Sequence, residues 1–112
     1  MDPVAALWEA LSEGRGYVAH DILADSGGTR CGAILPDGRR LLMGEEAIFA
    51  PGTVMSLALP REAEVRWIAN GETRLRENTD RLAARPAGPG VYRYEVRLDG
   101  RPWIFTNPFY LR

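Results

Sequence analysis

The sequence predicts an all-β protein, an immunoglobulin-like antiparallel β-sandwich of about seven to nine strands with one short N-terminal helix. Turn signals recur at nearly regular intervals along the 112 residues, and short segments of alternating apolar and polar residues separate them. The 12 Gly and 8 Pro residues suit a chain with many tight turns. A small closed barrel is the second architecture that fits the same pattern.

Residues 89–100 form the clearest strand of the chain. Pro-Gly opens this segment, Asp-Gly closes it, and Tyr92, Tyr94, Val96 and Leu98 alternate with charged residues between them. A period of two places these four side chains on one buried face. Tyr92 also lies where immunoglobulin-like domains carry a tyrosine whose hydroxyl bonds back to nearby backbone. Any amphipathic edge strand with two tyrosines would give the same pattern, so both interpretations stay open.

The N-terminal residues predict one amphipathic helix over residues 2–14, with Asp2 as N-cap and Pro3 at the first helical position. Its apolar residues recur at intervals of three and four, and they form one stripe: Val4, Leu7, Trp8 and Leu11. Because a sandwich closes its own core, we expect this stripe to stay partly exposed and to face a partner. The expected division is therefore a helical linker over residues 1–15 and a sandwich over residues 16–112.

The same alternation predicts the other strands. They cover residues 17–23, 29–35, 39–43, 53–59, 63–70, 73–77, 80–85 and 101–106, with a final segment at 109–112. Pro60 is expected to end the strand over residues 53–59. Asn70-Gly71 is the strongest hairpin signal, because both turn positions tolerate a positive φ.

The predicted structural core centres on the aromatic residues of these strands. Trp67 resembles the buried tryptophan of immunoglobulin-like sandwiches, although no cysteines flank it. The core list is Trp67, Tyr92, Tyr94, Val96 and Trp103. A second group of rings, Trp103, Phe105, Phe109 and Tyr110, either closes this core or forms an exposed platform for stacking on sugars. The core interpretation is preferred.

Composition argues against several partners. The formal net charge is -1, so nothing electrostatic indicates nucleic acid or an anionic membrane as a partner. Cys31 is the single cysteine and lies in an apolar run, which predicts a small core residue rather than a nucleophile. A chain without an internal disulfide or a recognisable signal peptide is expected in the cytoplasm.

No set of residues predicts a catalytic or metal site, and no cofactor is expected. His20, Asp21 and Asp25 form the only cluster that looks like a metal or acid–base site. Neighbours on a strand point to opposite faces, and one His and one Cys are too few for a usual zinc site. The paired carboxylates at residues 45–46 and at residues 62 and 64 are of a kind common on solvated surfaces.

Several segments resemble a known family when they are read together. Residues 90–96, GVYRYEV, and residues 102–111, PWIFTNPFYL, resemble the end of bacterial PHP-domain (polymerase and histidinol phosphatase) metal-dependent phosphoesterase-like proteins, which often finish GvYRvEv…pWiySNPiYv. Residues 6–21 look like the family's aLraGrcyvafD segment, and residues 43–46 resemble its mGdev. His20 departs from the pattern, because the family tends to have an aromatic residue there.

The resemblance implies a non-catalytic role. Catalysis in that family belongs to a TIM-like barrel whose metal ions are held by many His and acidic residues, and this chain has one His. It would then be an accessory sandwich in intramolecular contact with such a barrel, with residues 1–15 leading from one to the other. The isolated domain is expected to self-associate weakly. The alternative is a free-standing carbohydrate- or peptide-binding module.

Overall fold

The computed structural model describes residues 17–19 and 27–112, and all regular structure in these residues is β. The strands are β1 (Tyr17–Ala19), β2 (Arg30–Ile34), β3 (Arg40–Leu41), β4 (Glu46–Ala47), β5 (Val54–Ala69), β6 (Glu72–Ala84), β7 (Gly90–Leu98), β8 (Arg101–Thr106) and β9 (Phe109–Leu111). The all-β prediction is thus confirmed. The helix expected over residues 2–14 lies outside the described residues. Within those residues no helix exists that could span a membrane.

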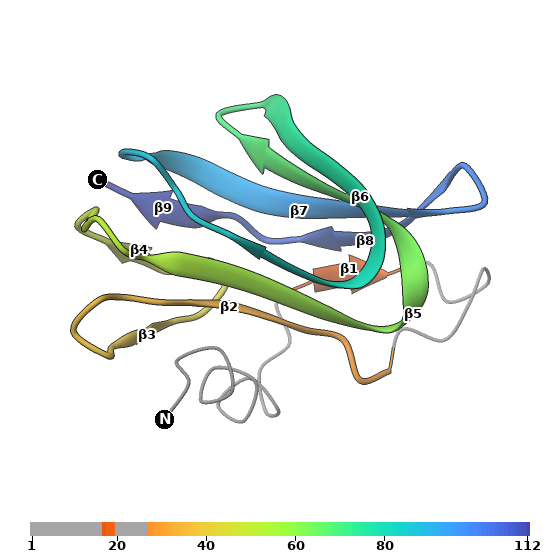
Figure 1. The fold of residues 1–112 in the computed structure, drawn as a ribbon, viewed down its shortest axis with the longest axis horizontal. Helices are drawn as coiled ribbons and strands as arrows, with labels where there is room; N and C mark the ends of the chain where they lie inside the picture. The colour runs from red at the N-terminus through yellow and green to blue at the C-terminus, as the bar shows by residue number, and fades with distance from the viewer. Residues whose placement is uncertain (1–16, 20–26) are drawn as a thin grey trace.

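The strands form one hydrogen-bonded sheet that curls into a nearly closed, barrel-like arrangement (Figure 1). Its main path runs β1-β8-β7-β5-β2-β3, while β6 pairs with β5, and β9 pairs with both β4 and β7. The long β5 makes this curl possible, because its first half pairs with β2 and its second half with β7. One strand therefore belongs to both walls of the core. This arrangement is closer to the barrel alternative than to two separate sheets.

The prediction that Pro60 ends a strand is wrong. Strand β5 runs through it, so the segments expected at residues 53–59 and 63–70 are one strand. The register with β6 shifts between Ala58 and Ala63, where residues 59–62 lie opposite Asp80 alone. A bulge of this kind tolerates a residue without an N–H and bends the strand. The segments expected at 73–77 and 80–85 are likewise the single strand β6.

The predicted tight turns are confirmed. Asn70 and Gly71 have φ of 51° and 83°, and Asp99 and Gly100 have φ of 53° and 76°. Positive φ at both central positions is the signature of the turn whose twist matches antiparallel strands. In the turn after β2, the Gly38 N–H donates to the Leu35 carbonyl at 2.9 Å.

The core lies inside the curled sheet. All five residues of the predicted core are buried, and Tyr94, Val96 and Trp103 have no exposed surface. Fully buried side chains of β5 and β9 pack into the same cluster: Met55, Leu57, Val65 and Phe109. The sequence alternation of β7 thus corresponds to a real inward face, with Arg93, Glu95 and Arg97 half-buried on the other side.

Candidate functional site

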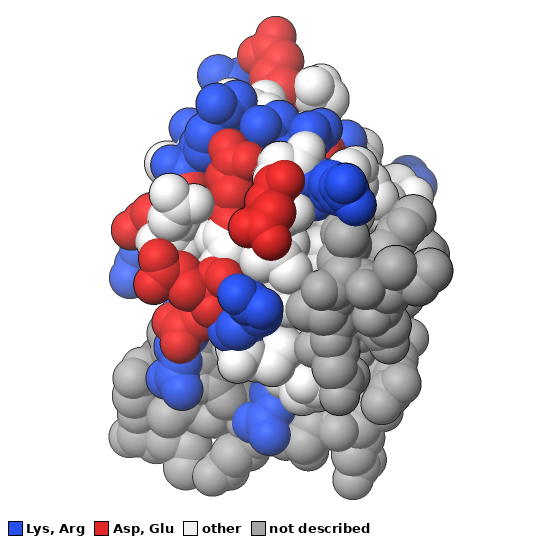
Figure 2. Space-filling view, turned by 90° about the vertical axis from the view of Figure 1, so that its right-hand side faces the viewer, with Lys and Arg blue, Asp and Glu red and all other residues white. Residues whose placement is uncertain are grey.

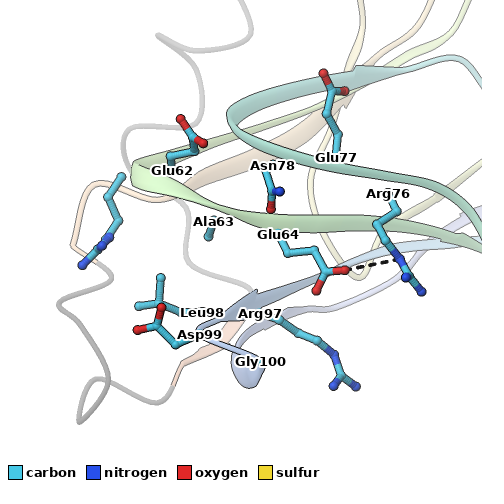
Figure 3. Close-up of a pocket in the computed structure, with 11 residues that line it drawn as sticks. Glu62, Ala63, Glu64, Arg76, Glu77, Asn78, Arg97, Leu98, Asp99 and Gly100 are labelled. Carbon is cyan, nitrogen blue, oxygen red and sulfur yellow. Dashed lines mark ion pairs between the residues drawn. The ribbon is translucent and has the colours of Figure 1, made fainter.

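A charged cleft of about 640 Å³ lies between the bend of β5–β6 and the β7–β8 turn (Figure 3). We call this hollow the charged cleft. Three arginines and four carboxylates line it: Arg61, Glu62, Glu64, Arg76, Glu77, Arg97 and Asp99. The register shift in β5 covers residues 59–62, and two of these, Arg61 and Glu62, line the cleft.

Three of the charged residues in this cleft form ion pairs. Glu64 lies 3.3 Å from Arg76 across β5–β6 and 3.3 Å from Arg66 on its own strand. Arg97 lies 3.0 Å from Glu95. Acidic and basic side chains interleave over this end of the molecule (Figure 2). A surface of alternating sign attracts neither anions nor cations strongly, so the cleft offers a ligand no dominant charge.

A smaller hollow of about 330 Å³ lies at the other end of β7, beside the β5–β6 turn. We call it the arginine pocket and define it by its lining residues: Trp67, Ala69, Asn70, Arg74, Arg85, Ala87 and Tyr92. The rings of Trp67 and Tyr92 stack with their centroids 5.4 Å apart and an interplanar angle of 14°. Both rings are buried, so they pack beneath the pocket and do not offer an exposed face on which a ligand could stack.

Specific hydrogen bonds hold the walls of the arginine pocket. The Tyr92 hydroxyl donates to the Gly88 carbonyl at 2.5 Å, the backward bond expected of a corner tyrosine. The Val91 N–H donates to Asn70 Oδ1 at 2.9 Å, and the Asn70 N–H donates to the Val91 carbonyl at 2.8 Å. Both the hairpin turn and the loop before β7 are therefore fixed to the start of that strand.

The polar groups of the arginine pocket are mostly donors. The Nε1–H of Trp67 is buried and has no hydrogen-bond partner among the described residues. Arg85 is exposed, and within the same residues it makes no ion pair. Arg74 lies 3.3 Å from Glu72, in an exposed pair that is weak in water. No carboxylate lines the pocket, so its chemistry suits a hydrogen-bond acceptor that carries negative charge.

The residues singled out from sequence for metal or acid–base chemistry fall into two groups. His20, Asp21 and Asp25 lie outside the described residues, as does the stripe of Val4, Leu7, Trp8 and Leu11. In residues 17–19 and 27–112, no three His, Cys, Asp or Glu side chains are placed to hold a metal ion.

The paired carboxylates have ordinary structural contacts. Glu45 accepts a hydrogen bond from the Leu42 N–H at 2.7 Å, and Glu46 forms an ion pair with Arg112 at 2.8 Å. These contacts close the connection between β3 and β4 and attach β4 to the chain end. Glu62 and Glu64 both line the charged cleft, where Glu64 is paired with arginines.

Cys31 is a core residue, as expected. It is almost fully buried, and burial raises the pKa of its thiol far above the usual range, while a hydrogen bond with Thr106 opposes this shift only in part. The thiol therefore stays protonated and a poor nucleophile. Burial also raises the pKa of the neighbouring Tyr94 hydroxyl.

The C-terminal rings close the core rather than form a sugar platform. Trp103 and Phe109 have no exposed surface, and Phe105 is half-buried. Tyr110 alone of the four is exposed, at 39%. A single ring is too little for the stacked platform considered from the sequence.

Comparison with known protein families, curated proteins and solved structures found no match to the chain. Sequence reasoning identified Trp67 and Tyr92 as core residues but missed the pocket that they underlie. Its basic residues, Arg74 and Arg85, carry no local signal, because exposed arginines occur throughout the chain. The Asn70-Gly71 turn was the one usable sign that residues on either side of it would converge.

Proposed function

We propose that this chain is a non-catalytic accessory domain of a PHP-type metal-dependent phosphoesterase-like protein, whose catalytic barrel would be a separate domain. The observation that carries the proposal is where the resemblance lies in the fold. The segments GVYRYEV and PWIFTNPFYL coincide with β7, β8 and β9, and they supply Tyr94, Trp103 and Phe109 to the fully buried core. Because the segments that resemble the family supply core residues, the resemblance supports a shared fold more than a shared active site.

The finer assignment to the immunoglobulin-like class belongs to this proposal. Two features support it: the bond from the Tyr92 hydroxyl to the Gly88 carbonyl, and the burial of Trp67 on β5. The continuous β5 and its bulge would then be a local modification that joins the two sheets of the parent fold.

The proposed contact with the barrel is the helical stripe of Val4, Leu7, Trp8 and Leu11. An amphipathic helix gains most of its stability from packing its apolar face against another surface. In the isolated domain the same stripe would promote weak self-association, which depends on protein concentration.

The test begins with the full reading frame of the gene, in which a His-rich barrel sequence is expected upstream of residue 1. The 112-residue chain, the barrel alone and the two joined are then assayed with bis(p-nitrophenyl) phosphate and Mn²⁺. We expect hydrolysis only where the barrel is present, and a higher melting temperature when the two are joined. Hydrolysis by the 112-residue chain that His20→Ala abolishes would overturn the proposal.

A matched pair of variants locates the contact. Trp8→Ala removes a ring from the stripe, whereas Glu9→Ala changes the next residue, which lies off the stripe. We expect Trp8→Ala alone to lower the melting temperature of the joined protein and to reduce self-association of the isolated chain in sedimentation experiments. Equal effects of the two variants would place the interface elsewhere.

The second candidate is a free-standing binding module, and the arginine pocket is the observation that favours it. Burial of Trp67, Trp103 and Phe109 leaves few exposed rings among the described residues for stacking on a sugar. A peptide or another ligand with an acidic group fits the donors of the pocket better.

A further inference from the structure

The arginine pocket differs from the charged cleft in the sign of its charges. Two arginines and no carboxylate line it, whereas the charged cleft mixes three arginines with four carboxylates. Exposed ion pairs are frequent elsewhere on the sheet, such as Arg39–Asp37 at 2.8 Å and Arg112–Glu46 at 2.8 Å. Arg85 stands outside every ion pair found within the described residues, so its guanidinium is available to a ligand.

The buried indole of Trp67 adds an independent observation. It is 7% exposed, it lines the pocket, and its Nε1–H lacks an acceptor in the part of the chain that the structure describes. The Nε1 atom has essentially no accessible surface, so the indole forms part of the floor of the pocket, and the NMR signal of its N–H can report on a ligand bound above it.

The walls of the pocket are fixed before any ligand arrives. The Tyr92–Gly88 bond holds the loop that carries Ala87, and the two bonds between Asn70 and Val91 hold the hairpin turn. A site whose walls are already ordered loses little conformational entropy on binding. The volume of about 330 Å³ corresponds to roughly ten water molecules, which limits the ligand to a small molecule or to one group of a larger one.

From these observations we propose that the arginine pocket binds the oxyanion of a small ligand, a carboxylate or a phosphate group, which accepts charge-assisted hydrogen bonds from Arg85 over the buried rings of Trp67 and Tyr92. Arg74 sits on the rim and adds positive charge, because its pair with Glu72 is exposed and easily exchanged. Carboxylate and phosphate share the required chemistry, since both match the planar fork of an arginine. This site does not depend on the proposed accessory role.

The test follows the indole Nε1–H signals of the 112-residue protein in ¹H–¹⁵N spectra, with the Trp67 signal assigned through Trp67→Phe. Sodium acetate and inorganic phosphate are titrated separately, with sodium chloride at the same ionic strength as the reference. We expect the Trp67 signal to shift and saturate with acetate or phosphate but not with chloride. Saturation with one alone identifies the source of the oxyanion, and a shift that is linear, or equal in chloride, overturns the proposal.

Matched arginine variants separate a built site from general charge. Arg85→Gln should raise the dissociation constant at least about tenfold, the usual effect of losing a charge-assisted hydrogen bond. Arg101→Gln removes an exposed arginine at the far end of β7 and should change it less than about twofold, as expected for screened surface charge. Equal effects of the two variants would overturn the proposal. Arg85 is exposed, so its variant is expected to fold, and the unfolding midpoint verifies this.

Discussion

Replacing Gly90 by alanine tests the contact that joins the β5–β6 turn to β7. A Cβ built on Gly90 would lie 2.8 Å from Asn70 Nδ2 and 3.0 Å from Asn70 Oδ1. Asn70 would have to move, and its Oδ1 accepts the hydrogen bond from Val91 N–H at 2.9 Å. Gly90→Ala is therefore expected to break this bond and destabilise the fold.

The magnitude follows from comparison with Gly88→Ala, the matched control. Nothing lies within 4 Å of a Cβ at Gly88, so both variants share the effect of alanine on the unfolded chain, and only Gly90→Ala has the clash. The lost hydrogen bond costs about 0.5–1.5 kcal/mol, and a distorted Asn70 rotamer costs a similar amount. Gly90→Ala should thus be less stable than Gly88→Ala by about 1–3 kcal/mol.

Urea unfolding followed by tryptophan fluorescence measures this difference, with equal m-values required for the comparison. A third arm repeats Gly90→Ala in an Asn70→Gly background, where the obstructing side chain is absent and the positive φ of residue 70 remains accessible. The cost should then largely disappear. Two results would contradict this reasoning: equal stability of Gly90→Ala and Gly88→Ala, or an unchanged loss of stability from Gly90→Ala in the Asn70→Gly background. Either would show that the Asn70 side chain does not obstruct a Cβ at residue 90.

Two further predictions concern the buried polar groups around Tyr94. Thr106→Val should cost about 1–3 kcal/mol in urea unfolding, because Thr106 Oγ1 accepts from the buried Tyr94 N–H at 2.9 Å and the variant leaves that donor unsatisfied; a loss no greater than that of the exposed control Thr73→Val would contradict this. Burial raises the pKa of the Cys31 thiol, so the folded state keeps a proton that the unfolded chain releases above about pH 8.5. This contribution is fully present below that pH and falls as pH rises, by up to about 1.4 kcal/mol per pH unit. Cys31→Ala should therefore have a flatter decline in urea midpoint above about pH 8.5 than the parent, and parallel declines would count against the assignment.

The local features of the fold were predictable because their causes are local. The alternation in β7 and the Asn70-Gly71 turn depend on side-chain period and on φ, which neighbouring residues decide. Pro60 misled the prediction for the same reason. Its missing N–H weakens strand pairing at one position. The bulge that accommodates Pro60 forms only when β5 pairs with β6, and the residues around Pro60 do not reveal that pairing.

The arginine pocket could not be predicted in this way, because its parts come from two separate segments, residues 67–74 and 85–92. They meet only when β5 pairs with β7 in a register that sets Trp67 opposite Tyr94 and Ala69 opposite Tyr92. A register shifted by one residue would turn the Trp67 indole to the outer face and leave Arg85 beside no aromatic base. The site is a consequence of register rather than of any motif.

The contacts that fix this register also hold the pocket open, which couples ligand binding to stability. Asn70 and Val91 exchange two hydrogen bonds across the turn, and Gly90 leaves room for the Asn70 side chain between them. A ligand that binds only the folded state stabilises it according to its concentration and dissociation constant. Gly90→Ala should therefore weaken oxyanion binding as well as folding, because it moves one wall of the site. Arg85→Gln should weaken binding alone, since its side chain has no described partner in the fold, so the two variants separate the recognition of the oxyanion from the scaffold that positions it.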